Sequence, residues 1–313
     1  MRVIFLGTPE FAVPSLQALI HSSFEVCAVF TQPDRPAGRG QKPQPPPIKS
    51  FAVRAGLPVF QPEKIRAQEN QSLLESYKPD VIVVVAYGQI LPKWLLELPH
   101  LGCVNVHGSL LPRYRGAAPI AWAVLNGDTM TGITTMLMDE HLDTGPMLLK
   151  REVEIPGTIT SGQLAETLAE AGAELLIPTL EGLGNGTLKA IPQDDALATL
   201  APRITKEMAR ISWNKDARSI HNQIRGLNPW PLAYAECLGQ RVQILQSSPP
   251  GGTQSAAHSP GTFVGLTDRG MKLACGSGTI LEILEVQPAG KRRMSGRDFV
   301  NGLHIKPGQQ AFA

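Results

Sequence analysis

The chain has 313 residues, 42% of them apolar and 18% charged, which predicts a globular protein with one sizeable core and a second, smaller one. Its first apolar run spans only residues 3–6, too short for a signal peptide or a membrane span, and the N-terminus lacks the composition of a transit peptide. We therefore expect a cytoplasmic protein that does not bind membranes. The net charge of +2 is unevenly spread, because residues 1–202 hold 15 Lys and Arg against 20 Asp and Glu, whereas residues 203–313 hold 14 against 7.

Short β-branched runs alternate with amphipathic stretches through the first half of the chain. This alternation is typical of βαβ units and predicts an α/β domain with a Rossmann-like, mostly parallel sheet. The run VIVVVA at 81–86 has no polar alternation, as expected for a central strand that is buried on both faces. The predicted strands are 3–6, 25–30, 81–86 and 104–107, and the predicted helices are 11–20, 48–55 and 91–98.

The middle of the chain continues with two further strands and a long helix. Residues 130–138 and 147–155 flank a polar loop and are predicted to pair. Thr160 and Gln163 have the spacing of a capping box, which predicts a helix from there to Leu183. Residues 191–202 lack helical periodicity and contain two prolines. The expected organisation is a catalytic domain at 1–190, a linker at 191–205 and a second domain at 206–313.

The C-terminal part changes to short strands separated by glycine turns. Five strands at this spacing predict a small OB-like β-barrel, a fold that suits a basic module. One helix, at 217–225, precedes the NPWP turn of residues 228–231, and the Ser-, Pro- and Gly-rich residues 247–261 are predicted to be a disordered loop. The predicted strands are 232–237, 242–245, 262–266, 271–274 and 279–286.

Two common kinds of site are disfavoured by the sequence. Residues 7–12 follow the first strand but lack the second glycine of G-x-G-x-x-G, which argues against a dinucleotide-dependent dehydrogenase. The four cysteines are scattered, without a C-x-x-C motif or paired histidines. We therefore expect neither a zinc site nor a disulfide framework, and we interpret all four cysteines as small buried apolar residues.

Asn105 and His107 are the first candidates for chemistry. Ligands bind at the carboxyl ends of the strands in open parallel sheets, and His107 ends a predicted strand. Asn105 lies two residues earlier, so both side chains leave the same face of the sheet. A single histidine at a strand end is more often structural than catalytic, but the nearby amide and the following glycine favour a catalytic pair.

Two loops complete the predicted site. Residues 109–112 place two leucines beside the polar pair, which suits a flat, largely apolar ligand, although these leucines could instead cap the core. Residues 138–145 form an acidic loop, a feature that is usually only a solvated turn. Here we expect Leu142 to anchor inward, so that the adjacent Asp143 is held partly buried where its carboxylate can act on a histidine.

Two stretches, NVHGSLLPRYRGAAPI at 105–120 and MDEHLDTGPML at 138–148, together resemble the signature of the folate-dependent formyltransferase family. The likeness covers nearly the whole chain and is far more specific than a single glycine motif. It implies transfer of the formyl group of 10-formyltetrahydrofolate to an amine. For the members that this chain resembles most, that amine is the α-amino group of methionine on initiator tRNA. Its formylation prepares this tRNA for the initiation of translation. The other matching stretches are FLGTPEFA at 5–12, TQPDRPAGRG at 31–40, VVVAYGQILP at 83–92, KEMARISW at 206–213 and NPWP at 228–231.

The resemblance also implies the site residues, and it implies no metal. In the family's reaction a neutral amine attacks the formyl carbon and leaves a tetrahedral intermediate with a negative oxygen. Asn105 and His107 would donate hydrogen bonds to that oxygen, and Asp143 would stabilise the imidazolium and accept the proton of the amine. The residues that the resemblance assigns to folate are Ser109, Leu110, Leu111 and Pro112, together with Tyr87, Gly88, Gln89, Ile90 and Leu91.

A long basic loop points to a tRNA acceptor. Residues 33–49 hold four Lys and Arg against one Asp, with six prolines and two glycines. Such a loop suits contact with an acceptor stem, and an ordinary solvated loop is the alternative. The family resemblance implies that the loop enters the stem region of the tRNA, with Arg39 as the leading contact. Together with the basic C-terminal third, the residues expected to contact tRNA are Arg35, Arg39, Lys42, Lys206, Arg210, Lys291, Arg292 and Arg293. We expect a monomer.

Two other functions stay open at this point. A formyltransferase that acts on a glycinamide ribonucleotide or an amino sugar nucleotide would keep the chemistry but leave the second domain and the basic loop unexplained. A non-catalytic nucleic-acid-binding module would have no use for Asn105, His107 and Asp143 in one cleft. Two features depart from the family pattern without touching these three residues: residues 247–261 resemble an insertion, and Pro146 replaces a residue that is often polar in relatives.

Overall fold

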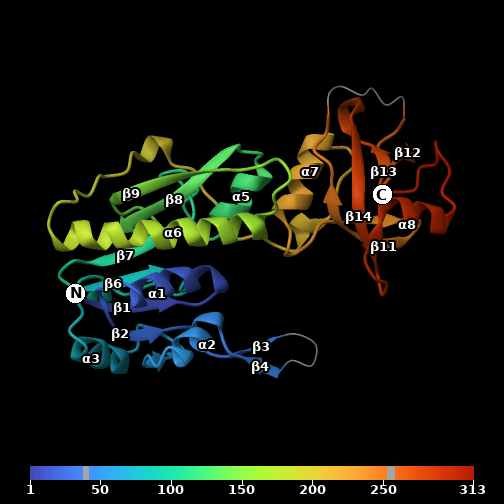
Figure 1. Cartoon of the computed structure of the whole chain (residues 1–313). Helices are drawn as coiled ribbons and strands as arrows, with labels where there is room; N and C mark the ends of the chain where they lie inside the picture. Colours follow the sequence, from blue (N-terminus) through green and yellow to red (C-terminus); the bar gives the residue numbers. More distant parts are fainter. Residues whose placement is uncertain (38–41, 252–257) are drawn as a thin grey trace. The chain divides into compact units, whose positions relative to one another are not determined.

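The computed structural model describes residues 1–37, 42–251 and 258–313 (Figure 1). Arg39 and residues 252–257 of the predicted loop at 247–261 therefore lie outside the described residues. The chain divides into two compact units. The first consists of Met1–Gly116, Thr131–Val153 and Ala165–Ala201, and the second of Ala117–Met130, Glu154–Leu164 and Pro202–Ala313. The domain boundaries at 190 and 205 stay a prediction.

The first unit is built on a sheet whose seven strands, among the described residues, run in the order β5-β2-β1-β6-β7-β8-β9. The strands from β5 to β7 pair in parallel, whereas β7 and β8 are antiparallel. The mostly parallel sheet expected from the sequence is thus confirmed. The strands are β1 (Arg2–Gly7), β2 (Glu25–Phe30), β5 (Val59–Phe60), β6 (Val81–Val85), β7 (Cys103–His107), β8 (Met130–Leu137) and β9 (Met147–Glu154).

The helix α6 (Ser161–Gly184) fixes which face of β7 is available for chemistry. It begins at the predicted capping box, where Thr160 N donates to Gln163 Oε1 at 3.0 Å and Gln163 N donates to Thr160 Oγ1 at 3.2 Å. A Cβ on Gly172 would lie 2.8 Å from Val106 Cγ1, so α6 packs closely against Val106. Because side chains alternate along a strand, Asn105 and His107 leave the opposite face of the sheet.

Shorter helices surround the same sheet, and a small hairpin lies within the predicted basic loop. The sequence reasoning did not predict the hairpin, the strand β5, or the helices α3 and α5. The hairpin consists of β3 (Arg35–Ala37) and β4 (Lys42–Gln44). The helices of this unit are α1 (Val13–Ile20), which follows the 3-10 turn η1 (Glu10–Ala12), and α2 (Pro47–Arg54), α3 (Gln68–Ser76) and α4 (Lys93–Leu96). The helix α5 (Pro119–Leu125) belongs to the second unit.

The second unit is a curled antiparallel sheet in the order β10-β11-β14-β13-β12, with β15 beside β14. Residues 309–313 hydrogen-bond to both of its edges: Ala313 N donates to Glu236 O at 2.8 Å, and Phe263 N donates to Gln309 O at 2.9 Å. The sheet therefore closes into a small barrel, as expected from the spacing of its strands. The strands are β10 (Tyr234–Cys237), β11 (Gln240–Ser247), β12 (Phe263–Leu266), β13 (Met271–Ala274), β14 (Ile280–Pro288) and β15 (Met294–Ser295).

Two helices complete the barrel unit. The predicted helix α7 (Ala217–Gly226) is capped by Asp216, whose Oδ1 accepts from Ser219 N at 3.0 Å. The helix α8 (Gly296–Leu303) was missed by the sequence reasoning and is capped in the same way by Ser295. The barrel core contains apolar residues from both helices, including Ile220, Ile224 and Phe299.

Arg225 explains why two segments from the first half of the chain belong to the barrel unit. Its side chain is buried, and its guanidinium donates to the backbone carbonyls of Val124, Pro156 and Ile159 as well as to Asn222 Oδ1. A buried guanidinium is stable only when its donors are satisfied. One side chain of α7 thereby holds residues from both inserted segments.

All four cysteines are buried and unpaired, which confirms their interpretation as small apolar residues. Burial raises the pKa of the Cys103 and Cys275 thiols to about 12, so both stay protonated at neutral pH. No helix in the described part of the chain is long and apolar enough to cross a membrane.

Candidate active site

The candidate site lies where the carboxyl ends of β1, β6 and β7 meet at one edge of the sheet. The strand β1 sits between β2 and β6, so the chain order reverses there, as it does in other open sheets that bind ligands at such a point. Thr8 Oγ1, after β1, donates to the carbonyl of Tyr87, after β6, at 2.9 Å. The loops that follow these two strands are therefore joined directly.

His107 ends β7 and is buried, with 6% of its surface exposed. Its Nε2 lies 3.0 Å from the carbonyl oxygen of Tyr114. A carbonyl only accepts hydrogen bonds, so this ring nitrogen carries the hydrogen. The Nδ1 atom lies 3.7 Å from Asp143 Oδ1, which is too long for a hydrogen bond but close enough for an ion pair. Both ring nitrogens therefore face oxygen atoms.

Asp143 is held beside His107 by its backbone and by one of its own carboxylate oxygens. Its Oδ2 accepts from Gly116 N at 2.8 Å, which leaves Oδ1 facing the imidazole. Its φ of 53° places it in the left-handed region, where a non-glycine residue is strained and must be held by its surroundings. The carboxylate is 13% exposed, so it is largely removed from water.

The expected cause of that burial was wrong. Leu142 does not anchor inward; it is 66% exposed. The loop is instead held by hydrogen bonds, among them a bifurcated one from Thr144 Oγ1 to the two oxygens of the Asp139 carboxylate, at 2.7 and 2.8 Å. Gly145 adds a close contact, because a Cβ there would lie 1.9 Å from the carbonyl oxygen of Leu137. Hydrogen bonds and the close contact at Gly145 therefore hold this loop in place of the expected apolar contact.

Asn105 lies on the same face of β7 as His107 and is partly buried. Its backbone pairs with Met136 of β8 and Val84 of β6, which fixes its position between two neighbouring strands. The structure gives its side-chain amide no hydrogen-bond partner within the described ranges. The amide is thus a positioned donor whose hydrogens have no partner in the part of the chain that the structure describes.

The loop of residues 109–112 is held rigidly by polar contacts. Ser109 is fully buried, its hydroxyl donates to the carbonyl of Arg113 at 2.6 Å, and its own carbonyl accepts from Thr134 Oγ1 at 2.7 Å. Leu111 packs with Met136 and Met147 in a small core cluster, so this leucine does contribute to the core. Leu110 and Pro112 are partly buried. Any contact of this loop with folate stays a prediction.

The loop of residues 87–91 combines buried anchors with one exposed apolar side chain. The Tyr87 ring is buried, which raises the pKa of its phenol, and Leu91 is buried as well. Gln89 is used by the fold, since its Oε1 accepts from Ile65 N at 2.7 Å. Gly88 has a φ of 86°, and the next-but-one residue, Ile90, is 89% exposed. Ile90 is thus an exposed apolar side chain in this loop, and its contact with folate stays a prediction.

Sequence reasoning missed Gln193, which lies in the segment expected to be a linker. Its Nε2 donates to the carbonyls of Asp143 and Gly145, each at 2.8 Å. Its Oε1 accepts from Arg115 Nε at 3.0 Å, and Arg115 Nη2 pairs with Asp195 at 2.7 Å. Gln193 and Asp143 are fifty positions apart in the chain, and no local pattern in the sequence predicts their contact.

The residues expected to contact tRNA lie on both units, and their role stays a prediction. On the first, Arg35 pairs with Glu63 at 3.0 Å, and Lys42 lies on the partner strand of the same hairpin. On the second, Arg210 lies 3.7 Å from Glu236, and Lys206 lines a pocket described below. Lys291, Arg292 and Arg293 are exposed in the turn between β14 and β15. Arg39 lies outside the described residues.

Within the described ranges, no group of three or more His, Cys, Asp or Glu side chains is placed to hold a metal ion. The site brings together an amide and an imidazole on β7 and a carboxylate on the acidic loop. Such a set can donate hydrogen bonds to a developing negative oxygen and can accept a proton.

Two family models match the chain. The model described as formyl transferase matches residues 1–180, and the model described as formyl transferase, C-terminal domain, matches residues 203–304. The chain belongs to the formyltransferase family. Two relatives of this formyltransferase are named methionyl-tRNA formyltransferase. The one from Ruminiclostridium cellulolyticum is 48% identical over 99% of both chains. The one from Bacillus velezensis is 49% identical over 98% of this chain and 96% of the relative.

A solved structure agrees with the fold of this formyltransferase. The N-formyltransferase from Helicobacter canadensis, in complex with folinic acid and dTDP-3-aminofucose, is 17% identical with a TM-score of 0.66. The match covers 90% of this chain and 98% of the other. At this level of identity the likeness concerns the fold of the formyltransferase and not its acceptor.

Proposed function

We propose that this formyltransferase transfers the formyl group of 10-formyltetrahydrofolate to the α-amino group of methionyl initiator tRNA. The proposal is supported by relatives of that name at 48% and 49% identity over nearly the whole chain. A basic second domain suits a polyanionic acceptor better than a small sugar. We further propose that the enzyme acts as a monomer in the cytoplasm, where translation begins.

In the proposed reaction, the amine of methionine attacks the formyl carbon, and the carbonyl oxygen becomes negative. The amide of Asn105 donates a hydrogen bond to this oxygen, because its hydrogens have no partner among the described residues. Removing one such donor from an active site typically lowers the rate about 10²-fold to 10³-fold. The strand position of Asn105 gives the donor a fixed place before the substrate arrives.

His107 supplies the second donor through Nδ1. The bond from Nε2 to the Tyr114 carbonyl orients the ring, and Nδ1 has no hydrogen bond among the described residues. Asp143 stabilises the positive imidazole and, directly or through a water, accepts the proton that the amine loses. The C–N bond to tetrahydrofolate then breaks, its nitrogen takes up a proton, and the formyl group stays on methionine.

The observation that carries the proposal is the buried pairing of His107 Nδ1 and Asp143 Oδ1 at 3.7 Å on the open face of β7. The test is an acceptor comparison with 10-formyltetrahydrofolate labelled in the formyl group. Methionyl initiator tRNA, uncharged tRNA, glycinamide ribonucleotide and an amino sugar nucleotide are supplied separately at equal concentration. We expect labelled formylmethionine from the first acceptor and background labelling of the others. Faster labelling of a small amine than of the charged tRNA would overturn the proposed acceptor.

Salt is expected to weaken the use of tRNA but not of folate. Each phosphate neutralised by Lys or Arg releases counterions, so raising KCl from 50 to 200 mM should raise KM for methionyl-tRNA roughly tenfold or more. KM for 10-formyltetrahydrofolate should change by less than about twofold, since it depends on few ionic contacts. Steady-state kinetics at four salt concentrations measure both constants. A KM for tRNA that does not change with salt would favour a small acceptor.

A further inference from the structure

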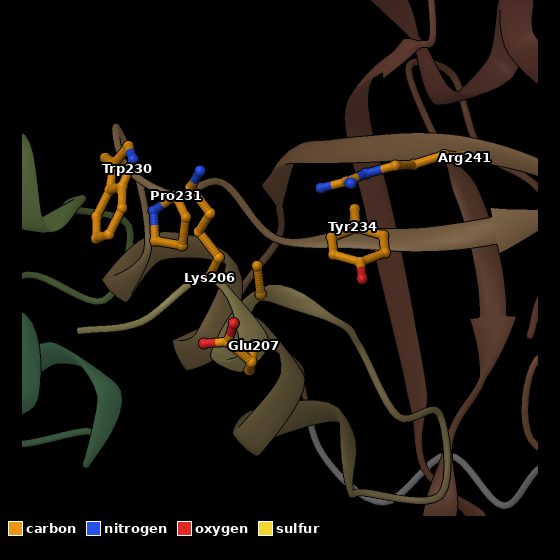
Figure 2. Close-up of a pocket in the computed structure, with 7 residues that line it drawn as sticks. Lys206, Glu207, Trp230, Pro231, Tyr234 and Arg241 are labelled. Atoms are coloured by element: carbon orange, nitrogen blue, oxygen red, sulfur yellow. The ribbon is translucent and has the colours of Figure 1, made fainter.

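An exposed tryptophan lines a pocket of about 400 Å³ on the barrel unit. Trp230, in the NPWP turn, is 53% exposed. An exposed indole ring does not gain the large favourable free energy that its burial would give. The prolines on either side of it restrict the backbone of the turn. Lys206, Pro231, Tyr234 and Arg241 line the same pocket (Figure 2). The remaining lining residues are Glu207 and Ala209.

Arg241 and Tyr234 form a fixed cationic platform in this pocket. The two residues are diagonal neighbours on β11 and β10, because Arg241 pairs with Glu236 two positions along the strand from Tyr234. The guanidinium carbon lies 3.6 Å from the centre of the Tyr234 ring. Both side chains are drawn in Figure 2. A stacked guanidinium keeps the N–H groups at its edge directed outward, which is the geometry that binds a phosphate with two hydrogen bonds.

The charge of the pocket suits an anion. Neither Lys206 nor Arg241 forms a salt bridge with an acidic residue of the described chain, whereas the nearby Arg210 is paired with Glu236 at 3.7 Å. One carboxylate, Glu207, lines the pocket; its pKa is lowered by a hydrogen bond from the Thr205 side chain and, to a smaller extent, by the charge of Lys206. Residues 203–313 carry 14 Lys and Arg against 7 Asp and Glu, so the whole unit attracts polyanions.

We propose that this pocket is a nucleotide subsite for the tRNA, in which an unstacked base lies on Trp230 and its phosphate binds Lys206 and Arg241. A flat exposed ring that shares a pocket with two cations is a combination by which proteins hold single nucleotides of a strand. The inference rests on the proposed tRNA acceptor. The subsite adds an aromatic contact with a base, and the affinity from this contact does not depend on salt. The phosphate contacts, by contrast, do not read sequence.

The test uses the whole enzyme and uncharged initiator tRNA as the probe. We expect Trp230→Ala to raise Kd for tRNA about 10-fold to 100-fold, the range found when a base loses its aromatic partner. Trp230→Phe should keep most of the affinity while abolishing the change in tryptophan fluorescence on tRNA binding. Leu266→Ala, which removes another exposed apolar side chain of the same unit, is the matched control and should bind as the wild type does.

Arg241→Ala separates the charge from the ring. We expect it to lower the slope of log Kd against log salt concentration by about one unit, the effect of losing one phosphate contact. Arg269→Ala, an exposed cation on the β12–β13 turn, should leave the slope unchanged. Wild-type affinity in Trp230→Ala, or an unchanged slope in Arg241→Ala, would overturn the subsite. Absence of formyl transfer to tRNA by the wild type would instead overturn the proposed function.

A second inference comes from the segment 193–201, which contacts both loops that hold the catalytic pair. Gln193 Nε2 binds the carbonyl of Asp143, and Thr199 Oγ1 accepts from the backbone nitrogen of Tyr114 at 2.8 Å. Tyr114 and Asp143 both have positive φ, 61° and 53°, and their strain persists only because neighbours hold them. Tyr114 in turn orients His107 through its carbonyl.

We infer that Gln193 is a positioning residue for the transfer step. Its amide fixes the peptide of Asp143 while its oxygen binds Arg115, which lies next to Tyr114. Small displacements of reacting groups can cost a factor of about 100 in rate. We expect Gln193→Leu to lower kcat about 10-fold to 100-fold with KM for both substrates nearly unchanged. Asp194→Asn, which changes the neighbouring exposed side chain, is the control and should keep wild-type kcat.

A double variant distinguishes positioning from a general loss of structure. If Gln193 acts through Asp143, Gln193→Leu should lower kcat little further in an Asp143→Asn background. Gln193→Glu keeps the shape but places an oxygen against two carbonyls, so it should be impaired as well, and it serves if the leucine variant does not fold. Wild-type kcat in both single variants, or a full additional loss in the double variant, would contradict the role. The inference on Gln193 rests on the proposed reaction, whose own failure would be seen as an inactive wild type.

Discussion

Replacing His107 by alanine is expected to lower kcat for formyl transfer about 10²-fold to 10³-fold, because the variant loses one donor to the developing oxyanion. The donor acts in the transition state and not in substrate binding, so KM for folate and for methionyl-tRNA should change little. Steady-state kinetics with labelled 10-formyltetrahydrofolate measure the effect. The change should therefore appear in kcat and in kcat/KM to the same extent.

Two further variants make this prediction decisive. His107 is buried, so replacing it by alanine can also loosen the loop that carries Tyr114. The variant His107→Gln lacks the imidazole but retains a side-chain donor for the Tyr114 carbonyl. We expect this variant to fold and to be as impaired as the alanine variant. His141→Ala removes an exposed histidine from the acidic loop and should be fully active. Near-normal turnover in both His107 variants would exclude the assigned role.

The change Asp143→Asn is expected to lower kcat about 10²-fold to 10⁴-fold, because the amide cannot accept the proton of the amine and carries no charge to stabilise the imidazole. Asparagine has the same shape as aspartate and adopts a positive φ at least as readily, so the change adds no backbone strain at this position. Its oxygen can still accept from Gly116 N, so the loop should keep its conformation. The unfolding temperature, measured alongside the kinetics, should be close to that of the wild type.

The matched control for this variant lies in the same loop. Asp139 accepts hydrogen bonds from Thr144 Oγ1 and from His141 N, but it has no contact with His107. Asp139→Asn therefore disturbs the loop without touching the imidazole, and we expect it to lower kcat by less than about tenfold. Equal losses in Asp139→Asn and Asp143→Asn would mean that the loop matters only as a structural element.

Much of the fold followed from hydrophobic patterning in the sequence. The unbroken apolar run of β6 predicted a strand buried on both faces, and Val81–Val85 are buried throughout. The capping box at Thr160 and Gln163 predicted the start of α6, since both of its hydrogen bonds are local. Local capping at Ser295 and Asp298 could have revealed α8 in the same way. The helix α5 is apolar with no polar face, so periodicity could not identify it.

The candidate site shows where reasoning from sequence ends. The alternation along β7 was enough to place Asn105 and His107 on one face, because that rule depends only on neighbouring residues. The position of Asp143 depends on Gly116 and Gln193, which are 27 and 50 residues away in the chain. The inward anchor expected at Leu142 was wrong for the same reason: in this loop hydrogen bonds over long chain distances outweigh the preference of a leucine for burial.

The most direct test of the central claim, that His107 and Asp143 act as one unit in formyl transfer, is a double-mutant cycle in single turnover. Four enzymes are compared: the wild type, His107→Ala, Asp143→Asn and the double variant. Each enzyme, in excess over labelled 10-formyltetrahydrofolate, is mixed with it and with saturating methionyl-tRNA, and the chemical step is followed by rapid quench. We expect each single variant to lose at least about 100-fold and the double variant to be little slower than the slower single variant. If the loss in the double variant equals the product of the two single losses, or if the single variants react as fast as the wild type, the claim that the two residues act as one unit is contradicted.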